Sequence, residues 1–244
     1  MKPQVKILLS GLLLIIVLFC LPTEYYLIEP GPTLNTKEFI STSATEERNH
    51  IYAPSVRLYE MKLFSLWEST AFNKLNANVF YVIYGTLHPN IHVNKLNSFL
   101  QEGTTSDAFE EVMRQLTQGS IYDVRAYVSQ RLNKTEEELN ITLKLKNEGS
   151  SVSSAFALEA VNQLGPKELT RGLKVAAVGK IAMDGEIYPV GAEIHKAQSA
   201  ENSNMDILFI SNRTNTDNIN QMKLNVNVIP VHSVDEAIAY LEAQ

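Results

Sequence analysis

The sequence predicts an α/β (α+β) fold preceded by one N-terminal transmembrane helix. Of the 244 residues, 45% are hydrophobic and 20% are charged, a balance typical of a globular protein. Apolar, β-rich runs alternate with helical patterns in the second half of the chain, which indicates mixed α/β organisation. Residues 7–21 read ILLSGLLLIIVLFCL and contain no charge, which indicates a membrane segment.

We expect residues 7–21 to be an uncleaved anchor, with residues 1–6 as a cytoplasmic tip. Lys2 and Lys6 precede the run, so the N-terminus is predicted inside and the main domain outside the cell membrane. The run covers roughly 22 Å as a helix, short of the ~30 Å hydrocarbon core, and we expect Lys6 and the apolar residues 25–28 to extend it. A cleaved signal peptide is the alternative, but no A-x-A-like site follows the run.

Composition and motifs narrow the possible functions. The net charge is −6 without a large basic block, which argues against a nucleic-acid partner. The only cysteine, Cys20, lies in the predicted anchor, so the outer region has no disulfide and no thiolate site. No GxxxxGK[ST] loop is present, and the histidines lack HExxH spacing, so we expect neither nucleotide hydrolysis nor a metal or other cofactor.

Residues 22–132 are expected to form an extracytoplasmic region of strands and helices. Two prolines and a glycine predict an extended segment over 25–36. A short turn at 117–119 predicts that two helices form a hairpin. The other expected elements are strand-like residues 50–61, a helix over 62–75, a strand over 77–85, and the two hairpin helices 105–116 and 119–132.

Residues 133–244 are expected to form the main α/β domain. Four apolar residues alternate with polar ones over 138–146, which predicts a half-buried strand. A helix follows the serine-rich stretch 150–154 and stops at Gly165-Pro166, and Asp184-Gly185 predicts a hairpin turn. The remaining expected elements are strands over 173–183, 205–211 and 226–233, and helices over 193–203 and 233–244.

The stretch EGSSVSSAFALEAVNQL (148–164) places four serines immediately before a helix. A serine there is usually a cap that accepts a hydrogen bond from a backbone N–H. The same place also suits a nucleophile, because the free N–H groups of a helix N-terminus stabilise an oxyanion. A nucleophilic serine needs a base, such as histidine or a buried lysine of lowered pKa. The residues alone favour the cap.

From Gly149 to the end, the chain resembles the proteolytic domain of Lon-type serine peptidases. The stretches that carry the resemblance are GSSVSSAFALEAVNQLGPKELTRGLKVAAVGKIAMDGEIYPVGAEIHKA, MDILFIS and VNVIPVHSVDEAIAYL. The chain is most like the membrane-anchored PDZ–Lon proteins of Gram-positive bacteria, whose N-terminal half is similar to the anchor with residues 25–32, to residues 55–67 and to the expected helix pair 105–132. Only a short stretch separates Leu132 from Gly149, too short for the PDZ module.

The resemblance implies an ATP-independent serine endopeptidase that cleaves peptide or protein substrates. FALE (156–159) sets a register in which the nucleophile is Ser151, and DGEIYPVG (184–191) sets one in which the general base is Lys196. Lon domains commonly form rings, so a homo-oligomer is the assembly that the resemblance implies. We expect nearby Lys180 and His195 to be surface residues.

The surroundings of the dyad depart from the family pattern. The family's threonine on the strand before the hairpin, which helps to orient the lysine, is Val178 here. Valine desolvates a nearby lysine but cannot hold its amine in place. The other departures are Ser150 for proline, Val152 for alanine, Ser153 for glycine, Ala192 for glycine and Glu193 for an apolar residue.

These departures leave two further hypotheses open. One is a pseudo-peptidase that keeps the fold, has lost activity and acts as a binding or regulatory protein, for example by adding peptide strands to its sheet. The other is a membrane-tethered structural module whose likeness to Lon is only architectural.

Overall fold

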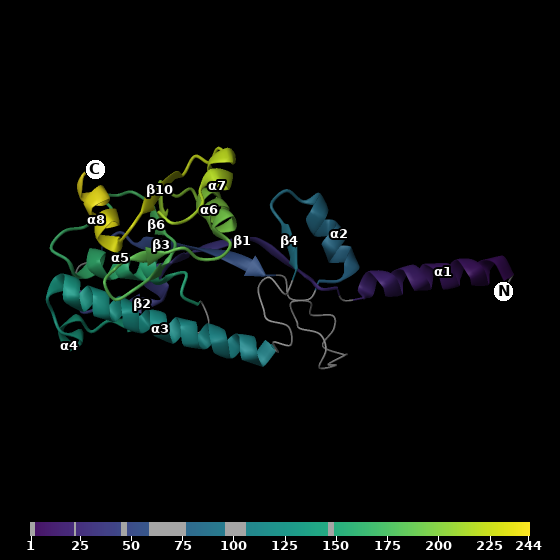
Figure 1. Ribbon diagram of the computed structural model, residues 1–244, viewed down its shortest axis with the longest axis horizontal. Helices are drawn as coiled ribbons and strands as arrows, with labels where there is room; N and C mark the ends of the chain where they lie inside the picture. The colour runs from purple at the N-terminus through teal and green to yellow at the C-terminus, as the bar shows by residue number, and fades with distance from the viewer. Residues whose placement is uncertain (1–2, 22, 45–47, 59–76, 96–105, 146–148) are drawn as a thin grey trace. The chain divides into compact units, whose positions relative to one another are not determined.

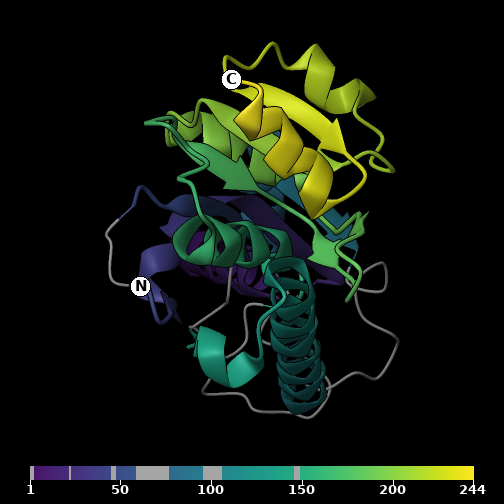
Figure 2. The same cartoon turned by 90° about the vertical axis from the view of Figure 1, so that its left-hand side faces the viewer.

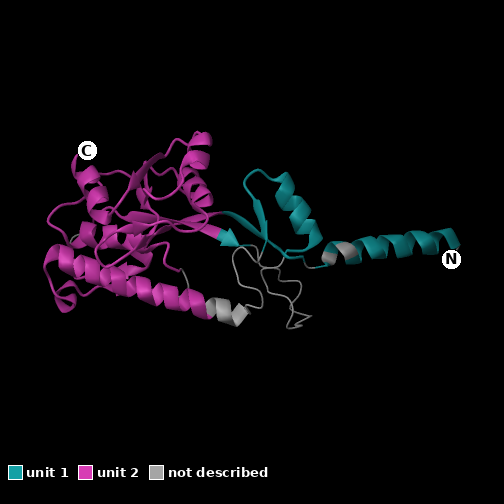
Figure 3. Ribbon diagram, in the orientation of Figure 1, with its two compact units in different colours: residues 1–29, 57–109 teal, residues 30–56, 110–244 magenta. Residues whose placement is uncertain are grey.

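The computed structural model describes residues 3–21, 23–44, 48–58, 77–95, 106–145 and 149–244 (Figure 1). The chain forms two compact units, residues 1–29 with 57–109 and residues 30–56 with 110–244 (Figure 3). The second unit has the mixed α/β architecture that the sequence predicts. Along the chain the helices and strands are α1 Pro3–Cys20, β1 Tyr25–Asn35, η1 Thr36–Glu38, β2 Ile40–Ser41, β3 Ile51–Leu58, α2 Val79–Leu87, β4 His92–Lys95, α3 Ser106–Leu132, α4 Glu136–Leu139, β5 Thr142–Leu143, α5 Ser153–Leu164, β6 Val175–Ala177, β7 Lys180–Ile181, β8 Ile187–Tyr188, α6 Glu193–Asn202, β9 Ile207–Ser211, α7 Asp217–Gln221, β10 Asn227–Val231 and α8 Val234–Glu242.

The main sheet of the second unit has the strand order β10-β9-β6-β3-β1. The pairs β10–β9, β9–β6 and β6–β3 are parallel. All five residues of β9 are buried, as expected for a parallel strand covered on both faces. Two short antiparallel pairs, β2–β5 and β7–β8, accompany this sheet.

Helices cover both faces of the main sheet (Figure 2). On one face, side chains of α3, α5 and α8 pack with β3, β6 and β9 in the larger hydrophobic cluster, which contains Phe156 and Phe209. On the other face, α6 and α7 pack against Ala176, Leu208 and Ile210 of β6 and β9. The two elements expected to carry the site, α5 and α6, therefore lie on opposite faces of the sheet.

The predicted helix hairpin over 105–132 is wrong, because these residues form one continuous helix, α3. Two residues around the expected turn are accommodated inside the helix. The hydroxyls of Thr117 and Ser120 donate to the carbonyls of Met113 and Leu116, four residues earlier. Gly119 lowers helix propensity by only about 1 kcal/mol, which packing along the helix overrides.

The predicted strand over 138–146 is confirmed in its burial pattern but not in its length. Leu139, Ile141, Leu143 and Leu145 are buried, while the residues between them are exposed. Residues 136–139 instead form α4, which has a capping box at Thr135, and β5 contains only two residues. Local capping therefore competes successfully with strand pairing at the start of this segment.

The expected single strand over 173–183 is broken into β6 and β7 at Val178-Gly179. Gly179 has a φ of +153°, which side-chain-bearing residues rarely adopt. A Cβ added there would lie 2.3 Å from the Cγ2 of Ile187. The break redirects the chain from the main sheet into the β7–β8 hairpin, whose turn at Gly185 (φ +85°) agrees with the prediction.

The elements predicted in the first unit were less accurate. The strand expected over 77–85 is the helix α2, whose N-cap Asn78 accepts a hydrogen bond from the N–H of Tyr81. Residues 25–28, expected to extend the membrane run, instead begin β1 and pair antiparallel with β4. The helix predicted over 62–75 lies outside the described residues. Residues 3–20 do form a helix, α1, but none of the helices in the described part of the chain is long and apolar enough to cross a membrane.

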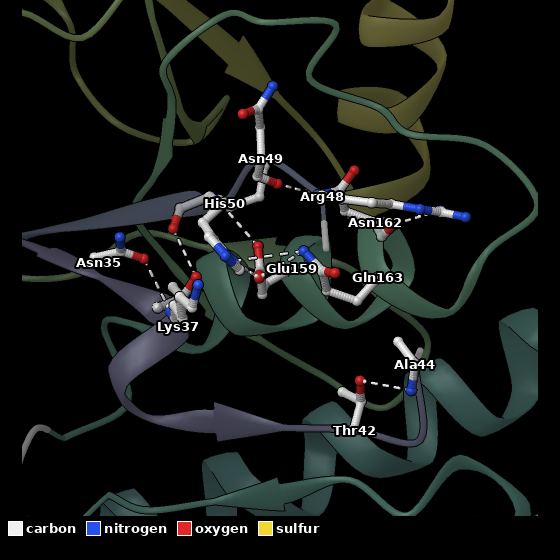
Figure 4. A network of polar contacts seen from close by, with 12 residues as sticks. Asn35, Lys37, Thr42, Ala44, Arg48, Asn49, His50, Glu159, Asn162 and Gln163 are labelled. Atoms are coloured by element: carbon white, nitrogen blue, oxygen red, sulfur yellow. Dashed lines mark hydrogen bonds and ion pairs between the residues drawn. The ribbon is translucent and has the colours of Figure 1, made fainter. Parts of the chain in front are cut away.

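A buried polar network joins α5 to the chain that enters β3 (Figure 4). The carboxylate of Glu159 is fully buried and lies 2.6 Å from Nδ1 of His50. Its second oxygen accepts from the N–H of Ile51 at 2.8 Å. One helical turn later, Asn162 donates to the carbonyl of Asn49 at 2.7 Å. These bonds fix the position of α5 along the sheet, and with it the turn that contains Ser151.

We predict that Glu159→Ala lowers the free energy of unfolding by about 3 kcal/mol. The change leaves the N–H of Ile51 and the ring of His50 buried without their acceptor. Denaturant unfolding measures the loss. Glu159→Gln, which keeps one oxygen, is expected to lose less, and Glu137→Ala on an exposed face is the control. An unfolding free energy unchanged in Glu159→Ala would contradict the role given to this network.

Candidate active site

Ser151 lies in a turn two residues before α5, as the sequence predicts. Two backbone hydrogen bonds hold this turn and the start of α5 against the break between β6 and β7, and a third bond ties the turn to α3. The N–H of Gly179 donates to the carbonyl of Ser151 at 3.1 Å, and the carbonyl of Gly179 accepts from Ser154 N–H at 3.1 Å. The N–H of Gly149 donates to the hydroxyl of Thr117 on α3. The backbone around Ser151 is therefore held from two sides, by the β6–β7 break and by α3.

The structure does not use Ser151 as a helix cap. The N-cap residue of α5 is Val152, which makes no side-chain capping bond. Within the described part of the chain the hydroxyl of Ser151 makes no hydrogen bond, and the side chain is only half-buried. A hydroxyl in this state is available to react, so the capping interpretation that the residues alone favour does not apply to Ser151.

Ser153 is the structural serine of the cluster, a role that its sequence position does not predict. Its buried hydroxyl donates to the carbonyl of Ser150 at 2.9 Å and accepts from the N–H of Ile181 at 2.9 Å. It thereby links the turn directly to β7. Four serines within five residues carry no signal that separates this one from its neighbours, because the distinction depends on where β7 lies.

Backbone N–H groups beside Ser151 are positioned to hold an oxyanion. The N–H groups of Ser153 and Ser154 are bonded to the carbonyls of Ser150 and Gly179. Those of Ser151 and Val152 make no hydrogen bond to the described residues. Donors at a helix N-terminus also carry the positive end of the helix dipole. They supply the electrostatic part of an acyl-transfer site.

Lys196 lies in the first turns of α6 and is 5% exposed. Its Nζ donates to the carbonyl of Gly191 at 2.9 Å. Burial lowers the pKa of Lys196 to about 8, and the negative charge of Glu193 partly opposes this. An amine with this pKa is substantially neutral near pH 8, which is what a general base requires.

Two departures from the family pattern have structural explanations at the start of α6. Ala192 is the N-cap residue and has a φ of +61°, in the left-handed region that favours glycine. Glu193 uses Oε1 to accept from the N–H of Val190 at 3.0 Å and from the hydroxyl of Thr214 at 2.8 Å. The glutamate therefore ties α6 to the loops on either side of it, at the expense of placing a negative charge near Lys196.

The prediction that His195 is a surface residue is wrong, because it is 4% exposed. Five residues of α6 are buried, namely His195, Lys196, Ala197, Ser199 and Ala200. They span more of the helix circumference than one amphipathic stripe, since α6 packs against the sheet and against α7. Lys180, by contrast, is exposed at the start of β7, as expected.

The Ser151 turn is bonded to Gly179, and α6, which contains Lys196, packs in the cluster of Val178, but Ser151 and Lys196 do not hydrogen-bond to each other in the described structure. Gly179 binds the Ser151 turn through its backbone, and the buried side chain of Val178 shares a hydrophobic cluster with Ala197 of α6. The amine of Lys196 is engaged by Gly191 instead. Direct proton transfer from Ser151 therefore requires its hydroxyl and Nζ to come within hydrogen-bond distance, with the lone pair of the neutral amine as acceptor.

Metal-binding clusters and surface hollows were the other places where a reaction centre could lie in the described part of the chain. In the part of the chain that the structure describes, no group of three or more His, Cys, Asp or Glu side chains could hold a metal ion. Two shallow hollows adjoin the α3–α4 region and are lined by residues such as Gln130 and Arg125. Neither hollow includes Ser151 or Lys196.

Comparison with known proteins does not assign the chain to a family. No protein-family model matches the sequence, and no curated protein matches it significantly.

The buried state of Lys196 predicts a pH-dependent stability. The folded pKa of about 8 lies below the ordinary lysine pKa of 10.5, so between these two pH values the unfolded chain binds more protons. Stability is therefore expected to rise with pH from about 8 to 10.5. Lys196→Met removes the cost of burying the charge and should stabilise the protein by up to about 3 kcal/mol below pH 8.

Unfolding at several pH values measures this difference, which should shrink as the pH approaches 10.5. Lys180→Met is the matched control, because Lys180 is exposed. A Lys196→Met effect that stays constant with pH would show that Lys196 titrates normally.

Proposed function

We propose that the chain is a membrane-anchored, extracytoplasmic serine endopeptidase of the Lon type, independent of ATP. Ser151 is the nucleophile and Lys196 the general base. The observation that carries the proposal is that an unbonded serine hydroxyl lies in a turn bonded to Gly179, while a buried lysine of lowered pKa lies on the helix that packs in the cluster of Val178. The resemblance to Lon selects these two residues through the registers at 156–159 and 184–191.

The proposed reaction uses each of these groups in a defined role. Neutral Lys196 takes the proton of the Ser151 hydroxyl as Oγ attacks the carbonyl carbon of the scissile peptide bond. The carbonyl oxygen becomes an oxyanion that accepts from the N–H groups of Ser151 and Val152. The protonated lysine then donates its proton to the leaving amine, which leaves an acyl-enzyme at Ser151. A water molecule, deprotonated by Lys196, hydrolyses this ester and releases the acid product.

A pseudo-peptidase is the second candidate, and a specific contact favours it. The amine of Lys196 donates to the carbonyl of Gly191 and makes no hydrogen bond with Ser151. Val178 has no hydroxyl that could orient the amine towards Ser151. Under this hypothesis the fold binds peptides without cleaving them. The two functions differ in whether purified protein cleaves an unfolded substrate at all.

The proposed location rests on α1. At least ten large apolar side chains between Val5 and Phe19 are exposed, including Leu8, Leu13 and Ile16. Lys2 and Lys6 precede the apolar run, which favours an inside N-terminus. We therefore propose that α1 holds the chain at the cell membrane with its main unit outside.

Cleavage of a fluorescently labelled unfolded protein such as casein tests the proposed activity. Ser151→Ala and Lys196→Ala are each expected to lower kcat/KM by on the order of 10³-fold or more, because the serine and its base act as one unit. Lys180→Ala and Ser150→Ala are the controls and should cleave like wild type. Equal cleavage by all five proteins would exclude the dyad, and absence of cleavage by wild type would favour the pseudo-peptidase.

The pH dependence of kcat/KM tests whether Lys196 is the general base, separately from whether the protein cleaves a substrate. Because only neutral Lys196 accepts a proton, kcat/KM should rise with pH and level off above about 8. Glu193→Gln keeps an oxygen for Val190 and Thr214 but removes the charge that raises the pKa of Lys196. The midpoint of the rise is therefore expected to move to lower pH in this variant. A midpoint that moves upward or stays in place would argue that Lys196 is not the titrating group.

A further inference from the structure

Helix α2 presents apolar side chains to the solvent, the reverse of an ordinary surface helix. Phe80, Ile83 and Leu87 are exposed, Leu87 to 76%. Their spacing of three and four residues places them in one stripe along the helix. No charged residue occurs between Val79 and Leu87. A helix of this kind is stable in water only if another apolar medium covers the stripe.

The opposite side of α2 is occupied by its own unit. Gly85 is buried, and a Cβ added there would lie 2.7 Å from Val93 of β4 and 3.1 Å from Leu27 of β1. Val82 and Tyr84 pack against the cluster of Leu27, Ala77 and Ile91. These contacts fix the rotation of α2, so its apolar stripe cannot turn inward without breaking them.

The exposed stripe of α2 is continuous with α1. Both helices belong to the first unit and contact each other, with the rings of Phe19 and Phe80 centred 6.4 Å apart. Along α1, the consecutive residues 12–17 are all exposed and all apolar. Six consecutive residues cover every direction around a helix. A groove of a protein partner covers one stripe of a helix, whereas lipid covers all sides.

We infer that α2 is a second membrane-contacting element, which lies on the surface of the lipid bilayer beside α1. This inference rests on the proposed anchoring by α1. The stripe of Phe80, Ile83 and Leu87 enters the boundary between headgroups and acyl chains, as in interfacial helices. The flanking aromatic residues fit this depth, since tyrosine is enriched at membrane interfaces. Tyr81 is the exposed tyrosine of α2.

Depth-dependent fluorescence quenching of the full chain in liposomes tests this inference. In a Cys20→Ser background, single cysteines at Phe80, Ile83 and Leu87 receive the environment-sensitive dye NBD. The protein is reconstituted in phosphatidylcholine–phosphatidylglycerol vesicles with or without lipids that carry a nitroxide on the acyl chain. Because an interfacial helix is buried ~5–10 Å, each of the three probes should lose about half of its fluorescence or more.

Two reference positions separate this inference from the proposed anchoring. Leu13→Cys reports on α1. Tyr122 lies on α3 in the second unit and is 60% exposed, so a probe on Tyr122→Cys should not be quenched. Quenching at Leu13 with none at the three α2 positions would overturn the inference and leave the anchor intact. Absence of quenching at Leu13 as well would overturn both.

A second copy of the chain is the competing occupant of the α2 stripe. It would shift NBD emission to the blue at Leu87 without quenching by nitroxide lipids, and that outcome also overturns the inference. All three positions are exposed, so the variants should keep the wild-type unfolding midpoint.

Discussion

The break between β6 and β7 at Val178-Gly179 is the constraint on which the candidate site depends. Gly179 adopts a backbone conformation that leaves no room for a side chain next to Ile187. The chain can therefore leave the main sheet at this point. The N–H of Gly179 then donates to the Ser151 turn, and its carbonyl accepts from the start of α5. Val178, one residue earlier, remains in the core against α6. Two consecutive residues thus connect elements that lie on opposite faces of the sheet.

The state of Lys196 is a balance between burial and one nearby charge. Desolvation lowers its pKa, while Glu193 raises it. Glu193 is retained for a structural reason, since it accepts hydrogen bonds from Val190 and Thr214 and so fastens the start of α6. Glu193 therefore orders the start of the helix and also limits how far burial lowers the pKa of Lys196. Val178 adds apolar surroundings but no polar group to direct the amine.

Patterns confined to one element were predicted well from the sequence. The alternation over 139–145, the hairpin turn at Gly185 and the capped helix α8 depend on neighbouring residues, and the structure contains all three. The errors occurred where a second element decides the outcome. Residues 77–85 are rich in β-forming residues but fold as a helix, because Asn78 caps them and they pack on β1 and β4. The turn expected in α3 is absent because side-chain hydroxyls find partners inside the helix.

The sequence alone determined the mixed α/β class and the place of Ser151 just before a helix, since these depend on local patterns, whereas the choice of Ser151 and Lys196 as candidates came from the resemblance to Lon. Tertiary structure decided which serine is structural, how deeply Lys196 is buried and which carbonyl its amine contacts. It also decided that His195 lies inside and that the apolar stripe of α2 lies outside. Burial and hydrogen-bond partners are properties of surfaces brought together from distant parts of the chain, and no local pattern encodes them.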